Sequence, residues 1–373
     1  MTFDGGRLIS WQMREARVGG KEDPPSGKRG YFHMKHIAVT VLALLFVLLR
    51  PVFAEDTIKV LMHESPNDPL PSPEAPKIDS LTGELFINGH FYYGSLDVLK
   101  DKNGLYVINN LPFEEYIEGV VAAEIGREWE TEALKAQAVI SRTYATFYKN
   151  YNSGNSFHIT SSILHQLYKG KNEDPLITDA VKATVGEILT YHNLPIKSFF
   201  HSTCGGKTEY PEEVWKESYP YLNSVDCYGR NAPYDNWQRS FSLKEISDAL
   251  GMGNIKEISI ASYTSTGRVK MLLITGQDKS GDSIMEIEAT ELRRLMGYKE
   301  LPSTQFSLER TGNDIIFTGK GFGHGVGLSQ WGALEMARQG KNYREILAHF
   351  YPGTILKHSG ELSYQDMALK RTP

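Results

Sequence analysis

The segment from Leu111 to Ile125 has the apolar spacing of an amphipathic helix, with one acidic residue inside the apolar stripe. Successive helical residues are turned by about 100°, which gathers Phe113, Tyr116, Ile117, Val120 and Val121 on one face. Pro112 suits the first helical position, and the helix dipole favours Glu114 and Glu115 in the first turn. Glu124 falls on the apolar face, one turn after Val120.

A carboxyl group among apolar side chains loses hydration, so we expect its pKa to rise above the reference value of about 4.3. Glu124 would then hold a proton near neutral pH and act as a general acid. The alternative is a core glutamate that pairs with Lys135 or Arg142, because structural ion pairs also perturb acids. This segment alone leaves both interpretations open.

Similar patterns predict further elements along the chain. Before Pro112 we expect a strand at 58–62, a hairpin of 85–89 and 91–94, and a strand at 104–109. After Glu124 we expect helices at 131–151, capped by Thr131, and at 179–189, then a buried strand at 196–202. A small unit at about 237–300 has the pattern helix, strand, strand, helix, and helices at 329–338 and 343–350 follow a glycine-rich strand and loop. The fold class is therefore α+β, with mixed helices and antiparallel strands.

Residues 34–54 have the organisation of a secretory signal peptide. Met34-Lys35-His36 precedes a mostly apolar run at 37–49, and a small-x-small cleavage site ends at Ala54. The run is short for a bilayer core of about 30 Å. We expect cleavage after Ala54 and export, with an uncleaved membrane anchor as the alternative. Residues 1–33 are then an upstream extension without a structural role, 55–76 a lead-in or linker, and 359–373 a C-terminal tail.

Composition and cysteine content narrow the class further. The chain of 373 residues is 40% hydrophobic and 23% charged, and its net charge is -5, which is ordinary for a globular protein and argues against nucleic acid as a partner. The two cysteines, Cys204 and Cys227, suggest one disulfide in an exported protein. A catalytic thiol at Cys204, or a metal site with His201, is the alternative, although no metal-ligand spacing is present.

Two later segments combine polar residues with glycines. The first is a hydrophobic strand that ends in His201-Ser202-Thr203-Cys204-Gly205-Gly206, and loops at strand ends often carry binding groups. In the second, glycine occupies every second position from Gly319 to Gly327, which in an extended chain would leave a flat face of bare backbone. That surface, with His324, Ser329, Gln330 and Trp331 nearby, would suit a polyhydroxylated ligand. No dinucleotide, Walker or zincin motif is present, so we expect neither cofactor nor metal.

Taken together, these segments resemble the SpoIID/LytB family, also called stage II sporulation protein D. The matching stretches are the block 112–144, residues 201–206 with Glu213-Val214-Trp215 after them, residues 321–333, and the ending at 346–354. The resemblance covers about residues 77–358. It implies a SpoIID-like core into which the unit at about 237–300 is inserted.

The resemblance implies that the substrate is peptidoglycan. SpoIID-like members are lytic transglycosylases that cut the β-1,4 bond between N-acetylmuramic acid and N-acetylglucosamine and leave 1,6-anhydro ends, whereas LytB-like members enhance cell-wall amidases. The family's catalytic glutamate falls by motif on Glu124, the position also reached from helical spacing. An ordinary glycosidase would need a second carboxylate, and the candidates for it are Glu209, Glu212, Glu213 and Asp226.

Further residues are expected to contact the substrate: Lys135, Arg142, His201, Ser202, His324, Ser329 and Gln330. Arg142 could hold a lactyl carboxylate or orient Glu124. The expected partners are glycan strands and a cell-wall amidase, in the periplasm or cell-wall space, with membrane contact only through the signal segment. Sporulation-type members of the family are usually membrane-anchored, whereas this chain has the pattern of a cleavable signal. A role in general remodelling of the cell wall is therefore expected as much as a role in sporulation. The competing functions are a non-catalytic amidase enhancer and a thiol or metal hydrolase built on Cys204 and His201.

Overall fold

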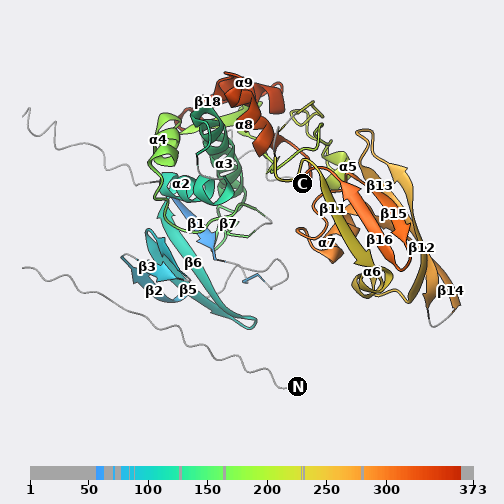
Figure 1. The fold of residues 1–373 in the computed structure, drawn as a ribbon. Coiled ribbons are helices and arrows are strands. Elements are labelled where there is room, and N and C mark those ends of the chain that lie inside the picture. The colour runs from blue at the N-terminus through green and yellow to red at the C-terminus, as the bar shows by residue number, and fades with distance from the viewer. Residues whose placement is uncertain are drawn as a thin grey trace, which may run out of the picture. The chain divides into compact units, whose positions relative to one another are not determined.

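The computed structural model describes residues 56–62, 70–71, 77–83, 85–87, 89–125, 128–162, 165–227, 229, 232–278 and 281–362. The expected upstream extension and signal peptide lie outside these residues, as do parts of the lead-in segment and the tail. The described chain combines helices with mainly antiparallel strands, as expected for an α+β protein (Figure 1). No helix among the described residues is long and apolar enough to cross a membrane.

A five-stranded sheet in the order β2-β5-β6-β1-β7 forms the N-terminal part of the described chain. Its strands are β1 (Thr57–Leu61), β2 (Lys77–Thr82), β5 (Ser95–Asp101), β6 (Gly104–Pro112) and β7 (Ile159–Thr160). The strand pairs are antiparallel except that β1 and β7 are parallel. The expected hairpin forms from β3 (Leu85–Ile87) and β4 (His90–Tyr92). Because β6 runs directly into the first described helix, the sheet fixes where that helix begins.

Three helices follow, namely α2 (Phe113–Glu124), α3 (Thr131–Tyr151) and α4 (Pro175–Ala183). The predicted apolar face of α2 is buried in a core cluster shared with the sheet. Three details differ from the prediction. Pro112 ends β6 and takes the N-cap position of α2 rather than the first helical position. Thr131 begins α3 rather than capping it, since Glu130 occupies the cap position without a side-chain bond. The third helix starts earlier than the expected 179–189, because Pro175 takes its first turn and the Asp174 carboxylate accepts from Leu176 N. It also ends earlier, at Ala183, and residues 187–189 belong to a strand.

The C-terminal part packs on α3 through α8 (Gln330–Arg338) and α9 (Tyr343–Phe350). A small sheet in the order β18-β8-β9 joins β8 (Glu187–Tyr191), β9 (Leu194–Pro195) and β18 (Ile355–His358). The expected strand at 196–202 is reduced to β10 (Phe200–His201), which pairs in parallel with β17 (Leu328–Ser329). This short pair brings together two segments that lie far apart in the sequence. A short helix, α5 (Glu212–Trp215), follows β10.

The unit expected at about 237–300 has its own hydrophobic cluster. Its elements are β11 (Trp237–Ser242), α6 (Leu243–Leu250), β12 (Asn254–Tyr263), β13 (Val269–Asp278), β14 (Gly281–Glu288), α7 (Ala289–Met296), β15 (Phe306–Thr311) and β16 (Asp314–Gly319). They form two three-stranded sheets, β12-β13-β14 and β11-β16-β15, and gather in one group in Figure 1. The cluster continues past residue 300 to Phe317. The expected pattern of helix, strand, strand, helix missed β14.

Candidate functional site

Glu124 is the last residue of α2, and the next residue, Ile125, has extended backbone. The Glu124 side chain is half-buried. The backbone N–H of Leu167 donates to Oε1 of Glu124 at 2.7 Å. This bond ties the carboxyl group to a loop that lies 43 residues further along the chain. The helix therefore supplies the acid, and the loop after α3 fixes one of its oxygen atoms.

Burial raises the pKa of Glu124 to about 7. Three groups oppose this shift by favouring the charged form: the Leu167 N–H, the Gln330 side-chain amide and the more distant positive charge of Lys169. The effect of desolvation on the pKa is larger than the effect of these three groups. A carboxylate at this site loses its hydration and has no directly paired cation to replace it. A carboxyl group with this pKa changes its protonation state around neutral pH, so it can both give and take a proton.

A network of amide side chains lies next to Glu124. The Gln330 Nε2 lies 3.5 Å from the backbone oxygen of Glu124 and 3.4 Å from Oε1 of Gln137. Gln137 in turn donates to Oγ of Ser141 at 3.1 Å. Of the expected substrate residues, Gln330 is the one that the structure brings against Glu124. Sequence reasoning missed Gln137, although a glutamine within the alanine-rich face of α3 is an unusual polar position.

Two buried tyrosines complete the surroundings of the acid. Tyr116 and Tyr144 both have a phenol pKa raised well above its usual value, mainly by burial and in part by the negative charge of Glu124. The Tyr116 hydroxyl donates to Oε1 of Gln166 at 3.2 Å, and Gln166 donates to the backbone oxygen of Ser141. Both phenols stay neutral at physiological pH, so they provide neutral polar surroundings for the carboxyl group.

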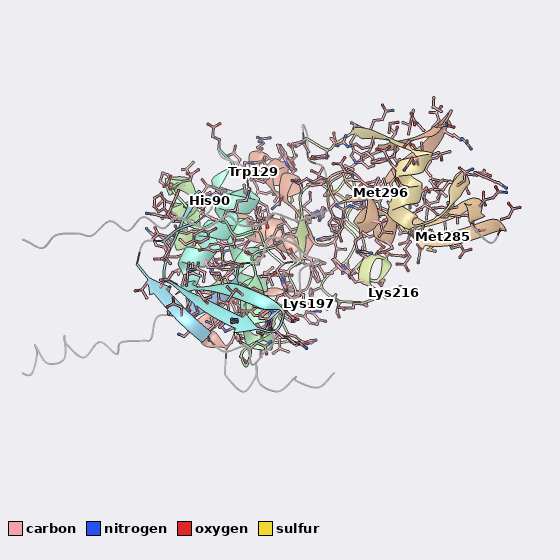
Figure 2. The ribbon with its side chains drawn as sticks, turned by 90° about the horizontal axis from the view of Figure 1, so that it is seen from below. His90, Trp129, Lys197, Lys216, Met285 and Met296 are labelled. Atoms are coloured by element: carbon pink, nitrogen blue, oxygen red, sulfur yellow. A yellow bond between two sulfur atoms is a disulfide. The ribbon has the colours of Figure 1, made fainter. Side chains whose placement is uncertain are left out.

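The second and third polar segments meet through Ser202 and Ser329. The Trp331 N–H donates to the backbone oxygen of Ser202 at 3.1 Å, and Oγ of Ser329 accepts from Gly332 N as the cap of α8. The Trp331 ring also meets the ring of Trp129, labelled in Figure 2, with centroids 5.4 Å apart. Because Gln330 lies between Ser329 and Trp331, these contacts hold it against Glu124. Ser329 itself is buried and acts as a cap.

The glycine-rich segment differs from the expected strand with a bare face. Gly321, Gly323, Gly325 and Gly327 all have positive φ, between 70° and 115°, so the chain is not extended there. A Cβ on Gly327 would lie 2.0 Å from the backbone oxygen of Phe199, and one on Gly323 would lie 2.7 Å from Cβ of His201. These glycines therefore allow close packing of the protein against itself. The expectation of a flat glycine surface for a ligand is wrong.

The two histidines expected near the substrate support this packing. Nδ1 of His201 lies 3.1 Å from the backbone oxygen of Val326, and the Val326 N–H donates to Nδ1 of His324. Burial lowers the pKa of His201 well below its usual value and that of His324 to about 3. Both rings are therefore neutral at physiological pH. Their positions identify them as supports of the 321–327 loop, and no bond joins either of them to Glu124 among the described residues.

Lys135 and Arg142, the two cations of α3 that were expected near the substrate, are paired away from Glu124. Lys135 Nζ lies 2.7 Å from Oε1 of Glu132. Arg142 is 0% exposed, donates through Nε and Nη2 to the Glu114 carboxylate at 2.8 and 2.7 Å, and bonds two backbone oxygens. The alternative of a core ion pair between Glu124 and either cation is therefore wrong. Arg142 is also too deeply buried to hold a lactyl carboxylate, and it binds α2 to α3 instead.

The cysteines and the other candidate acids lie away from Glu124 or are held by other partners. A disulfide joins Cys204 to Cys227, with a Cα–Cα distance of 6.5 Å, and leaves no free thiol. Glu209 is buried and accepts from the hydroxyls of Thr264 and Thr266. The remaining candidates also lie elsewhere: Glu213 pairs with Lys270, while Glu212 and Asp226 are exposed. Among the described residues, no group of three or more potential ligands could hold a metal ion.

These features define a class: a mixed α+β protein in which three separate chain segments surround one half-buried carboxyl group. A family model described as Stage II sporulation protein matches residues 101–191, which include this carboxyl group. A second model, described as a domain of unknown function (DUF8618), matches residues 231–327, the inserted unit and the glycine-rich loop.

Several relatives match most of the chain. Stage II sporulation protein D of Bacillus amyloliquefaciens is 34% identical over 74% of this chain and 82% of its own length. An uncharacterized protein of Brachyspira hyodysenteriae is 34% identical over 72% of each chain. The amidase enhancer of Bacillus subtilis is 27% identical over 64% of this chain and 40% of its own length. The chain therefore belongs to the SpoIID family.

Proposed function

We propose that this protein is a peptidoglycan lytic transglycosylase and that Glu124 is its acid/base. The observation that carries the proposal is the carboxyl group of Glu124, whose pKa is raised to about 7 by burial. A general acid works best when its pKa lies near the working pH. The membership of the SpoIID family supports the choice of glycan strands as the substrate.

One carboxyl group is enough for this reaction because the proton is recycled. Protonated Glu124 gives its proton to the glycosidic oxygen as the bond from C1 of N-acetylmuramic acid to that oxygen breaks. The N-acetylglucosamine chain leaves with a free hydroxyl. The carboxylate then takes the proton of the C6 hydroxyl while O6 bonds to C1 and closes the 1,6-anhydro ring. Glu124 ends protonated, and no water is consumed.

The neighbours of Glu124 have positioning roles in this scheme. The Leu167 N–H fixes Oε1, and the Gln330 amide favours the carboxylate that follows the first proton transfer. The Gln137–Ser141 contact in turn positions Gln330. Lys135 and Ser202 are half-buried and stay proposed contacts for more distant parts of the substrate.

Mass spectrometry of the products tests the reaction. The purified protein is incubated with intact and with amidase-treated sacculi, beside Glu124→Gln and Glu118→Gln. Glu118 is the matched control because it lies on the same helix and its carboxylate accepts from Thr178 Oγ1, a bond that glutamine can also accept. We expect 1,6-anhydro ends from the wild type and from Glu118→Gln, and none from Glu124→Gln. Full cleavage by Glu124→Gln would overturn the assignment.

A second function has support from one comparison, since a relative is named amidase enhancer. In that case the protein would bind the wall and stimulate an amidase without cutting glycan. Addition of a cell-wall amidase to the same assay distinguishes the two functions. If the protein is only an enhancer, the wild type and Glu124→Gln should increase the release of peptides by the amidase to the same extent. We further propose export to the periplasm or cell-wall space through the segment 34–54.

A further inference from the structure

The sheet β12-β13-β14 of the inserted unit has a straight, open edge at β14. This strand pairs with β13 in continuous register over all 8 of its residues, from Gly281 to Glu288, without a bulge. Among the described residues, no hydrogen bond joins the backbone of β14 to an element other than β13. An edge strand directs its backbone groups alternately towards its neighbour and away from it. A row of N–H and C=O groups of β14 is therefore accessible to a further strand.

The opposite edge of the same sheet is protected. The pairing of β12 with β13 shifts register between Ile255 and Glu257, and again between Ile260 and Tyr263. Such irregularities interrupt the row of backbone groups that another strand would need. The guanidinium group of Arg310, on β15, also donates to a backbone oxygen of β12. Of the two edges of this sheet, β14 is therefore the one that can accept a strand.

The two faces of β14 differ in character. Met285, labelled in Figure 2, and Ile287 pack in the hydrophobic cluster of the inserted unit. Because the side chains of a strand alternate, Asp282, Ile284 and Glu286 lie on the opposite face, and all three are exposed. Ile284 is 74% exposed. An open edge that carries an exposed apolar side chain is a template for pairing with another chain.

Carboxylate groups surround Ile284 on this exposed face. Thr275 of β13 pairs with Ile284 on one side and with Glu257 of β12 on the other. Glu257 and Glu286 form no ion pair among the described residues. The two other acids of β14 each pair with a surface lysine, and exposed pairs of this kind are weak. The face is therefore negatively charged and complementary to a basic partner.

The charges of β14 also distinguish between possible occupants. A second copy of the chain could add its own β14 in the antiparallel direction. A pairing centred on Met285 would then place Asp282 of one copy opposite Glu288 of the other, and like charges at opposed positions destabilise a sheet. A segment with lysine or arginine at every second position would instead place cations beside these acids.

We propose that β14 binds an extended, basic segment of a partner protein as an additional strand of this sheet. The backbone groups of β14 provide the affinity, and the carboxylates select for lysine and arginine. Ile284 packs against an apolar side chain of the bound segment. This surface uses none of the groups around Glu124, so the proposal does not depend on a catalytic role of that residue. It gives the inserted unit a function in recognition of another protein.

Fluorescence anisotropy with the whole chain and three labelled synthetic peptides, each as long as β14, tests this surface. Lysine alternates with valine in the first peptide. Glutamate replaces lysine in the second, and proline replaces valine in the third. We expect binding of the first peptide alone, because the second has the wrong charge and the third cannot form a regular strand. The affinity should fall as the salt concentration rises.

Charge reversal of the exposed face provides the test by mutation. The double change Glu257→Lys and Glu286→Lys should weaken binding of the lysine peptide by about tenfold, because two attractive surface contacts become repulsive. The double change Glu300→Lys and Glu361→Lys is the matched control. Both of these glutamates are exposed and lie outside the sheet, and the variant has the same net charge as the first one. The control variant should bind the peptide as the wild type does.

Hydrogen–deuterium exchange locates the bound peptide. The lysine peptide should slow amide exchange in Gly281–Glu288 and leave Asn254–Tyr263 unchanged. The proposal would be overturned by binding without slower exchange in β14, by equal binding to the Glu257→Lys and Glu286→Lys variant, or by an affinity weaker than about 1 mM for the wild type. Slower exchange in β14 that depends on protein concentration, without peptide, would also overturn it and would identify a second copy as the occupant.

Discussion

Replacement of Glu124 by glutamine should stabilise the fold above neutral pH. The pKa of Glu124 is raised from 4.5 to about 7 in the folded protein. Between these values the native state binds more protons at this site than the unfolded chain does, so stability falls as pH rises. The loss begins near pH 4.5 and is complete above about pH 7. With 1.36 kcal/mol for each pKa unit, it amounts to about 3 kcal/mol.

Glutamine is a neutral side chain of the same shape, and its oxygen can still accept from the Leu167 N–H. It does not titrate, so it escapes this loss. The wild type and Glu124→Gln should therefore be equally stable near pH 4.5. At pH 8 the variant should be more stable by about 3 kcal/mol, the linkage expected for this shift.

Urea unfolding at pH 4.5, 6 and 8 measures the difference through the unfolding midpoint and slope. Glu118→Gln is again the control and should show no comparable dependence on pH. A difference between wild type and Glu124→Gln that is the same at all three pH values would refute the reasoning, since it would mean that folding does not perturb this carboxyl group. Greater stability of the wild type at pH 8 would show that the carboxylate is stabilised rather than desolvated.

Three more predictions concern Gln330 beside the acid, the buried Arg142 and the disulfide. Gln330→Ala should move the alkaline limb of the pH–rate profile to higher pH, because the Gln330 amide favours the carboxylate and its loss raises the pKa of Glu124 further. An alkaline limb at the same pH would contradict this role. Arg142→Met should lower the free energy of unfolding by about 3 kcal/mol, because it leaves the Glu114 carboxylate without its buried partner. The double change Cys204→Ser and Cys227→Ser should cost about 3 kcal/mol by releasing a loop of this length, yet leave glycan cleavage intact, whereas loss of cleavage in the folded variant would revive a catalytic role for sulfur.

The elements around the acid could be predicted from the sequence because their signals are local. The spacing of apolar residues in 113–124 predicted both the helix and the burial of Glu124, and the structure confirms each. The bounds of α3 were also predicted correctly. Both bounds of α4 were missed, although Asp174 followed by Pro175 is a strong signal for the beginning of a helix. The sequence therefore contained the signal for the start of α4, and the prediction relied too strongly on the spacing of apolar residues.

Other features could not be predicted because they depend on contacts between distant segments. Gln330 approaches the backbone oxygen of Glu124 from 206 residues away, and no local pattern indicates that contact. The alternating glycines suggested a strand, but positive φ at Gly321 and Gly327 bends the chain and turns these positions toward the protein. Likewise, Arg142 was a candidate for substrate binding until its partner, Glu114, was known.

The placement of these residues bears on the choice between the two proposed functions. The histidines, glycines and Arg142 act in packing, so a protein that only bound the wall would need them as much as an enzyme would. Glu124 is different, because its raised pKa predicts that ionisation destabilises the fold by about 3 kcal/mol above neutral pH. Stability is often given up where catalysis requires a perturbed group. A wall-binding protein gains nothing from that loss, whereas a single acid that must give and then recover a proton requires a pKa near 7. We infer that the energetics of Glu124 favour the transglycosylase.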